Sequence, residues 1–229
     1  MTVAPVITID GPTASGKGTI AQRVADALRF NYLDSGALYR MVAWRALQDA
    51  VAADNAGRLA SIAAVIAPRF ADGRISMDGK DVTKAIRTEE VSQLASKIAV
   101  FEGVRKELLE LQRARRTLPG LVADGRDMGT VVFPDAYTKI YLTANVDARA
   151  DRRYKQLIEK GFPATIRPLS QEQVRREIEL RDQRDAQRAA SPLEPAEDAY
   201  RIDSSQLSVD EVVALVLKRY AQGKVVSKR

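Results

Sequence analysis

Residues 11–17 read Gly-Pro-Thr-Ala-Ser-Gly-Lys, the pattern G-x-x-x-x-G-K of loops that bind the phosphates of nucleoside triphosphates. Glycines let the backbone curl so that successive N–H groups point at phosphate oxygens, and Lys17 adds a point charge for the β- and γ-phosphates. An apolar, β-branched run over 3–9 predicts a buried strand before the loop. Apolar side chains at helical spacing in 17–29 predict a helix after it. The chain therefore opens as strand, phosphate loop and helix.

One position departs from the commonest form of this loop. In GTPases and motor ATPases a hydroxyl residue directly follows the lysine and ligates Mg²⁺. Here Gly18 follows Lys17, and the hydroxyl comes one residue later, at Thr19. The sequence therefore disfavours a GTPase or a motor ATPase but still predicts a loop that binds a nucleoside triphosphate. The residues that we expect to contact the triphosphate are Gly11, Pro12, Thr13, Ala14, Ser15, Gly16, Lys17, Gly18 and Thr19.

Composition removes several kinds of chemistry. The chain of 229 residues has no cysteine and no histidine, which excludes thiolate redox chemistry, zinc fingers and Ser-His-Asp catalysis. The net charge is +6, and 25 of the 36 basic residues are arginines, whose planar fork suits phosphate; a biased genome would also produce this count. No apolar run reaches about 18 residues, and the N-terminus has no basic leader, so we expect a cytoplasmic protein without membrane association.

The rest of the chain alternates short apolar runs with helical patterns, which favours a parallel sheet covered by helices. Two Asp-Gly pairs in 69–88 flank the alternating segment RISM and predict a small β-hairpin or meander that interrupts this order. Further strands are expected at 30–33, 121–123, 139–144 and 200–203. Helices are expected at 37–53, 55–66, 88–116 and 208–221.

Three longer motifs resemble those of bacterial cytidylate kinases. They are Asp-Ser-Gly-Ala-Leu-Tyr-Arg at 34–40, Ala-Asp-Gly-Arg-Asp-Met-Gly-Thr-Val-Val-Phe-Pro at 123–134, and Arg-Asp-Gln-Arg-Asp-Ala-Gln-Arg at 181–188. The third departs from many relatives, which carry Arg-Asn where this chain has Ala186 and Gln187. The similarity covers essentially the whole chain, including the insert at 69–88.

The resemblance implies an α/β fold: a P-loop kinase core with a parallel five-stranded sheet flanked by helices, an inserted lobe that binds the nucleoside monophosphate, and a helical lid. On this chain the core would comprise 1–36, 117–148 and 191–229, the lobe 37–116 with the hairpin insert 69–88, and the lid 149–190. The family transfers the γ-phosphoryl group of ATP to CMP or dCMP with Mg²⁺. Its members are usually monomers, and no nucleic acid takes part.

The resemblance also implies roles for individual residues. Lys17, Arg126 and Arg184 would be catalytic, and Asp124 would reach the metal ion through water. Arg152 and Arg153 are the lid candidates for contact with ATP. The expected CMP-binding residues are Ser35, Tyr39, Arg40, Ser96, Arg105, Arg126, Asp127, Arg181, Asp185 and Arg188. From spacing alone, Ser96 and Arg105 are more simply read as solvated helix residues.

The sequence leaves two alternatives to a cytidylate kinase. A different small-molecule kinase with a P-loop, such as a shikimate or dephospho-coenzyme-A kinase, does not account for the motif at 123–134. A nucleic-acid-binding module would account for the basic composition and the isoelectric point near 9.6. Aromatic residues are only 6% of the chain and do not gather among the lid arginines, so the stacking surface of such a module is missing.

Overall fold

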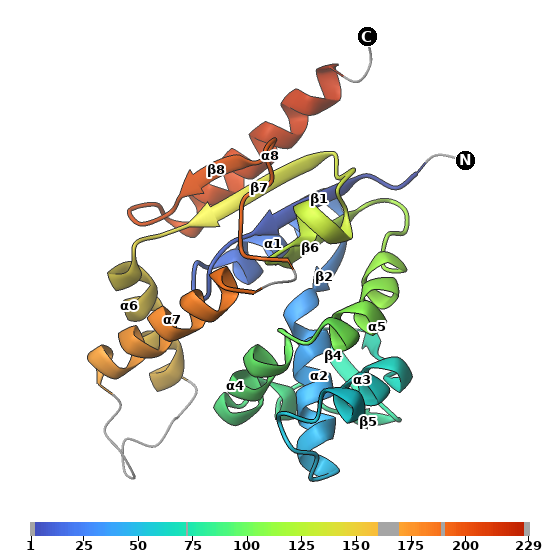
Figure 1. Ribbon diagram of the computed structural model, residues 1–229. Coiled ribbons are helices and arrows are strands. Elements are labelled where there is room, and N and C mark those ends of the chain that lie inside the picture. Colours follow the sequence, from blue (N-terminus) through green and yellow to red (C-terminus); the bar gives the residue numbers. More distant parts are fainter. Residues whose placement is uncertain (1–2, 72, 160–169, 189–190, 227–229) are drawn as a thin grey trace. The chain divides into compact units, whose positions relative to one another are not determined.

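The computed structural model describes residues 3–71, 73–159, 170–188 and 191–226 (Figure 1). By its internal contacts the chain forms two compact units: Met1–Leu33 with Arg116–Arg229, and Asp34–Arg115. The boundaries of the expected lobe and lid stay predictions. The sequence also predicts that Gly161, Pro163 and Pro168 divide the lid into two helices, but these residues lie outside the described ones. In the part of the chain that the structure describes, no helix is long and apolar enough to cross a bilayer.

The first unit is built on a five-stranded sheet, which confirms the expected α/β class. Its strand order is β2-β6-β1-β7-β8, and β1 pairs in parallel with β6 and β7, as β7 does with β8. The strands are β1 (Val6–Asp10), β2 (Asn31–Asp34), β6 (Leu121–Gly125), β7 (Thr138–Thr143) and β8 (Tyr200–Asp203). Since parallel strands end at one edge of a sheet, the residues that follow β1 and β6 lie next to each other.

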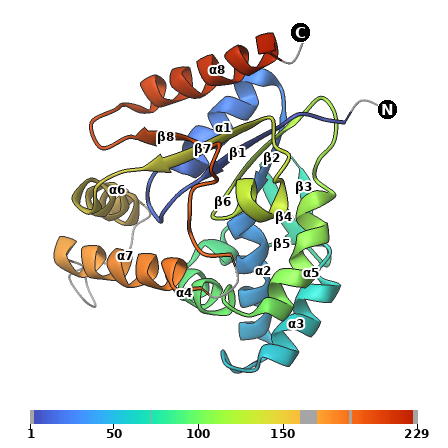
Figure 2. The ribbon, with the colours of Figure 1, turned by 45° about the horizontal axis from the view of Figure 1, so that its top comes forward.

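Every residue of β1 is buried, as expected for a central strand of a parallel sheet that is covered on both faces. One face packs against α1 (Lys17–Leu28) and α8 (Val209–Val226), which lie side by side in Figure 2. Ser208 caps α8: its Oγ accepts the Glu211 N–H at 3.3 Å, and the Glu211 carboxylate accepts the Ser208 N–H at 2.8 Å. The strand was predicted from residue 3, but it begins at Val6, after Pro5, which has no N–H to donate to a ladder.

Two further helices of this unit pack against each other, α6 (Val146–Glu159) and α7 (Gln171–Ala186). They share a small apolar cluster to which α6 contributes Ala150 and Leu157, and α7 contributes Val174 and Ile178. Ser170 and Gln173 form a reciprocal cap at the start of α7. A short π-helical turn, η2 (Met128–Val132), follows β6.

The second unit combines helices with a small antiparallel sheet. The predicted meander is confirmed as β3 (Arg69–Ala71), β4 (Arg74–Met77) and β5 (Lys80–Asp81). Asp78 and Gly79 both take positive φ, 52° and 76°, as a tight two-residue hairpin turn requires. The helical elements are α2 (Ser35–Gln48), α3 (Ala56–Val65), η1 (Ala85–Arg87), α4 (Glu89–Ile98) and α5 (Glu102–Arg113).

The single helix expected over 88–116 is wrong, since the structure has α4 and α5 with a break between them. Phe101 is extended there, with φ −77° and ψ 117°. Val100, Phe101 and Gly103 are weak helix formers, and the break lets α4 pack on α2 while α5 packs on α3. A Cβ on Gly103 would lie 3.2 Å from Cβ of Ala60, so glycine permits that close approach.

Gly120, which precedes β6, lies against the core. A Cβ there would meet Cε2 and Cζ of Phe30 at 2.5 Å, and the Phe30 ring packs edge-on against Tyr220 with ring centroids 5.8 Å apart. We expect Gly120→Ala to lower the free energy of unfolding by about 1–3 kcal/mol, because a close-packed core resists extra volume. Urea unfolding followed by circular dichroism measures this.

Gly57→Ala is the matched control. A Cβ on Gly57, in α3, meets nothing closer than Asn55 Oδ1 at 4.0 Å, so this change should stabilise the helix by up to about 1 kcal/mol. Equal stability of the wild type and Gly120→Ala would contradict the packing at Phe30.

Candidate active site

The phosphate loop joins β1 to α1 and has no room for a side chain at its first glycine. A Cβ on Gly11 would lie 2.0 Å from the carbonyl oxygen of Leu142 in the neighbouring strand β7. Gly16 caps α1 with φ 89°, a conformation that side chains rarely adopt. The loop therefore needs glycine for close approach at one end and for backbone conformation at the other. Its N–H groups and the start of α1 form the kind of site that binds anions.

Lys17 is buried at the start of α1, with 8% of its surface exposed, and its Nζ donates to the carbonyl oxygen of Pro12 at 3.0 Å. Burial holds the pKa of this ammonium well below its ordinary value, and the nearby charges of Arg126 and Arg181 lower the pKa further. Asp124 and Asp10 act in the opposite direction. A bound polyanion would relieve this concentration of positive charge, which is what a phosphate site requires.

Asp124, in β6, is a buried carboxylate near the start of α1. It accepts a hydrogen bond from the Tyr32 hydroxyl at 2.7 Å. A Cβ on Gly18 would lie 3.8 Å from Asp124 Oδ2, so this carboxylate stands beside the position where many P-loop proteins carry the metal-binding hydroxyl. Within the described residues no group of three or more acidic side chains gathers as a metal site.

Arg126 and two residues of the third motif form one buried ion network. Arg126 Nε donates to Asp185 Oδ2 at 2.7 Å, and Arg188 donates to the other oxygen of the same carboxylate. Asp185 is 1% exposed and Arg188 is 9% exposed. Burial lowers the pKa of Arg126, and the carboxylates of Asp124 and Asp182 oppose that shift. The structure thus brings together three residues predicted for the acceptor site, one directly after β6, one on α7 and one in the turn that follows α7.

Two residues that the sequence did not single out, one on α6 and one on α7, also contact the phosphate loop. Arg149 is 7% exposed and donates to the carbonyl oxygens of Ala144 at 2.9 Å and Thr13 at 3.2 Å. It also pairs with Asp182, and Asp182 accepts the Thr13 N–H at 3.4 Å. The motif at 181–188 contains Asp182, whereas nothing in the sequence distinguishes Arg149 from the many other basic residues near it.

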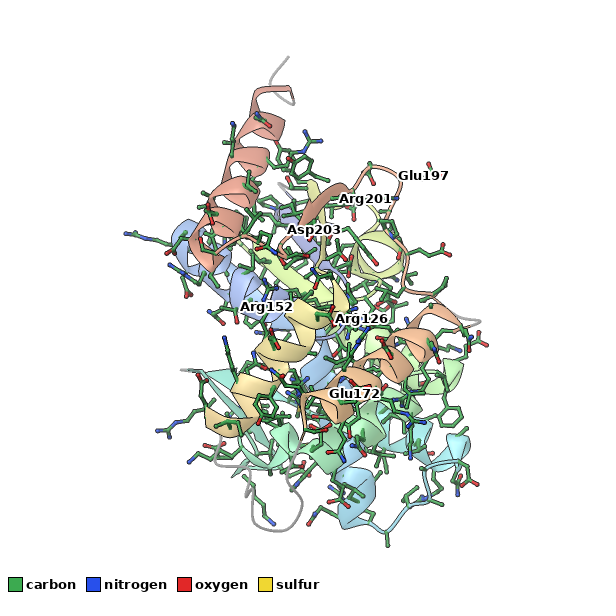
Figure 3. The ribbon with its side chains drawn as sticks, turned by 90° about the vertical axis from the view of Figure 1, so that its left-hand side faces the viewer. Arg126, Arg152, Glu172, Glu197, Arg201 and Asp203 are labelled. Atoms are coloured by element: carbon green, nitrogen blue, oxygen red, sulfur yellow. The ribbon has the colours of Figure 1, made fainter. Side chains whose placement is uncertain are left out.

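Arg152, one of the two arginines expected near ATP, reaches the loop but is engaged with protein groups. It donates to the carbonyl oxygen of Ser15 at 3.3 Å and to Ser204 Oγ at 3.1 Å. Figure 3 shows it with Arg126 on the side of the first unit that α6 and α7 cover. Arg153 follows on α6, and Arg184, on α7, donates from Nε to the carbonyl oxygen of Leu180 at 3.2 Å. The contact of these arginines with a phosphate stays a prediction.

The second unit holds five of the predicted acceptor residues, Ser35, Tyr39, Arg40, Ser96 and Arg105, whereas Asp127 and Arg181 belong to the first unit. Ser35, Tyr39 and Arg40 lie on the first turns of α2, and Arg40 Nη2 donates to Asp34 Oδ2 at 2.6 Å. Asp34 also caps α2 by accepting the Ala37 N–H at 3.0 Å. The motif at 34–40 therefore begins a helix and orients one arginine.

Ser96 lies on α4 and is 4% exposed, so its interpretation as a solvated helix residue is wrong. Its Oγ has no hydrogen-bond partner among the described residues, which leaves a buried hydroxyl available to a ligand. Arg105 lies near the start of α5, and its Nη1 donates to the carbonyl oxygen of Ala99 at 3.3 Å.

Asp10, the last residue of β1, was missed although it directly precedes the loop. Its two carboxylate oxygens accept the N–H groups of Met128 at 2.9 Å and Gly129 at 2.8 Å. Burial raises its pKa to about 7, and the two N–H donors oppose that rise. An acidic residue closing an apolar strand before a phosphate loop was the available signal.

A parallel sheet whose first strand leads through this glycine loop and buried lysine into a helix defines a P-loop phosphotransferase. The family model described as cytidylate kinase matches residues 7–222 of this chain. The chain belongs to the cytidylate kinase family, and it is a nucleoside monophosphate kinase. This assignment sets aside the other P-loop kinases and the nucleic-acid-binding module.

Curated relatives agree over nearly the whole length. The cytidylate kinase of Cupriavidus pinatubonensis is 53% identical over 221 residues, covering 96% of this chain and 98% of its own. Those of Ralstonia nicotianae and Ralstonia pickettii are 53% and 54% identical and cover 100% and 98% of this chain. Among solved structures, a putative kinase from Chloroflexus aurantiacus covers 97% of this chain at 15% identity with a TM-score of 0.44, too low to add to the assignment.

The raised pKa of Asp10 predicts a pH-dependent stability. An unfolded aspartate titrates near pH 3.9, whereas the folded value is about 7, so the folded chain holds the extra proton between these values. The stability from this group is full below about pH 4 and is lost as the pH rises through about 7. As the pH rises from about 5 to about 8, the free energy of unfolding of the wild type should therefore fall by about 2–3 kcal/mol relative to that of Asp10→Asn. Urea unfolding of both proteins at the two pH values measures this; a difference that does not change with pH would contradict it.

Proposed function

We propose that the protein transfers the γ-phosphoryl group of ATP to CMP and dCMP, giving ADP and the cytidine diphosphates. The family match over residues 7–222 supports the reaction. The observation that carries the proposal is the buried Lys17 ammonium, which donates to Pro12 of the glycine loop, with Arg126 and Arg181 close enough to lower its pKa. Such a cluster of cations matches two phosphate-bearing substrates better than one.

On the donor side, the loop residues 11–19 would bind the triphosphate of ATP and Lys17 would contact its β- and γ-phosphates. The transition state of phosphoryl transfer is loose, so the enzyme mainly positions the substrates and neutralises charge. No histidine base is needed, which agrees with the composition. Arg184, with Arg152 or Arg153, would approach the transferred group as the lid closes. Arg152 would first have to exchange its contacts with Ser15 and Ser204 for a phosphate.

On the acceptor side, Arg40 and Arg126 would hold the phosphate of CMP. Both already donate to carboxylates, Asp34 and Asp185, which preorganise the two guanidinium groups. Each keeps further N–H donors for a phosphate because a guanidinium carries five.

The sugar and base would be held by the remaining predicted residues. Asp127, 5% exposed, would accept from the exocyclic amino group of cytosine. Uracil presents an acceptor at that position, so a buried carboxylate facing it would lack a donor, which costs about 1–3 kcal/mol. The other contacts proposed for CMP come from Ser35, Tyr39, Ser96, Arg105, Arg181, Asp185 and Arg188.

Mg²⁺ would enter with ATP. Sites for this ion commonly use one or two carboxylates together with substrate phosphates, and the single buried carboxylate of Asp124 beside Gly18 fits that donor set. When bound, Mg²⁺ would neutralise charge on the β- and γ-phosphates. Asp124 would hold it through water, oriented by the Tyr32 hydroxyl. A monomer in the cytoplasm, as the family resemblance implies, completes the proposal.

A panel of monophosphates tests the proposed function. With ATP and Mg²⁺, ADP release should be fastest with CMP and dCMP, and kcat/KM for UMP should be lower by about tenfold or more. Lys17→Ala should lower kcat by about 10²- to 10³-fold, because a preorganised charge is lost from the transition state. Lys218→Ala, an exposed lysine of α8, is the matched control and should keep full activity. Faster reaction with AMP or GMP than with CMP would refute the proposal.

A further inference from the structure

Asp10 occupies a junction that the proposed roles leave unused. Asp10 is the last residue of β1 and directly precedes Gly11, where the phosphate loop begins. Its carboxylate, 6% exposed, binds the N–H groups of Met128 and Gly129, which follow directly after Asp127. These hydrogen bonds join residues more than a hundred positions apart in the chain. One side chain thus connects the donor loop to the turn that carries two proposed acceptor contacts.

Gly129 lets the turn approach β1 closely. A Cβ on Gly129 would lie 2.8 Å from Thr8 Oγ1 and 3.4 Å from Asp10 Oδ2. Thr8 Oγ1 is itself buried and has no hydrogen-bond partner among the described residues. The backbone of Gly129 therefore lies close to the side chains of Thr8 and Asp10, with no space for a side chain of its own. The two hydrogen bonds of Asp10 therefore act through a tightly packed contact.

We propose that Asp10 is a positioning residue that holds the turn 126–129 at a fixed distance from the phosphate loop, so that the acceptor phosphate meets the donor in line. This role rests on the proposed function of Arg126 and Asp127. Asp10 touches neither nucleotide in this account. It acts through the backbone of Met128 and Gly129 and determines where the Arg126 guanidinium lies.

The charges around Asp10 agree with this role. Lys17 and Arg126 are the cations that interact with it, and Asp127 and Tyr141 are the other titratable groups that face it. An ionised carboxylate accepts both N–H groups, whereas a protonated carboxyl group uses one oxygen to carry the proton. Because its pKa is about 7, the test belongs near pH 8, where Asp10 is mostly ionised.

The first test replaces Asp10 with asparagine and measures CMP kinetics near pH 8. The oxygen of the amide can accept from one of the two N–H groups, but its NH₂ group faces the other N–H group, and two donors cannot form a hydrogen bond. Losing one charge-assisted hydrogen bond should lower kcat/KM for CMP by about ten- to a hundredfold, through both a lower kcat and a higher KM for CMP. KM for ATP should change by less than about threefold, because Arg149 and Asp182 hold the loop independently at Thr13.

Asp135→Asn is the matched control. It makes the same chemical change and removes the ion pair with Arg116, but Asp135 is exposed, so CMP kinetics should match the wild type.

A second pair of variants tests the same contact from the other side. Gly129→Ala adds a Cβ that meets Thr8 Oγ1 and Asp10 Oδ2, so it should raise KM for CMP and lower kcat as Asp10→Asn does. Thr8→Ala removes the nearest of those atoms. The double variant Thr8→Ala/Gly129→Ala should therefore recover a large part of the lost kcat/KM. A loss of stability alone would lower kcat for every substrate alike and would leave KM for CMP unchanged.

The outcomes separate the two proposals. If the wild type prefers CMP and Lys17→Ala lowers kcat as predicted, but Asp10→Asn keeps kcat/KM for CMP within about twofold, Asp10 does not position the turn and the proposed function stands. An equal fall of kcat for all substrates, with both KM values unchanged and no recovery in the double variant, would also overturn the positioning role. A wild type without CMP activity would overturn both proposals before any variant is compared.

Discussion

The site depends on one constraint: the Lys17 ammonium group is buried at the start of α1, against the phosphate loop. Burial of a cation is costly unless an anion comes to meet it. In this protein the cost is increased, because Arg126 and Arg181 add positive charge and lower the pKa of Lys17 further. A bound phosphate would therefore offset the cost of this buried positive charge. The glycines at 11 and 16 allow the backbone to form the loop.

Carboxylates keep the surrounding arginines in place. Asp185 binds Arg126 and Arg188, Asp182 binds Arg149, and each of these pairs involves α7 or the turn that follows it. A buried pair is expensive to break by removing one partner, since the other charge is left alone. The pairs thus hold guanidinium groups near the loop and leave spare N–H donors for a ligand. The proposed chemistry follows from positioning and charge, without an acid–base residue.

The loop, the sheet and the small meander could be read from the sequence because their signals are local: a glycine pattern, apolar runs and Asp-Gly turns. Features that depend on contacts between distant parts of the chain could not be predicted in this way. The break at Phe101 depends on α4 and α5 packing on different helices, and the burial of Ser96 depends on that same packing. Asp10 was missed because its partners, Met128 and Gly129, are distant in the chain, and Arg149 because its neighbours in sequence are equally basic.

The most direct test of the central claim is the pKa of Lys17, measured by NMR of its side-chain amine in the free protein and with a non-hydrolysable ATP analogue. Burial of Lys17 predicts a pKa well below the ordinary value of about 10.4 in the free protein and a rise when the triphosphate binds, since the anion stabilises the charged form. A pKa near 10.4 in the free protein, unchanged by the analogue, would contradict it.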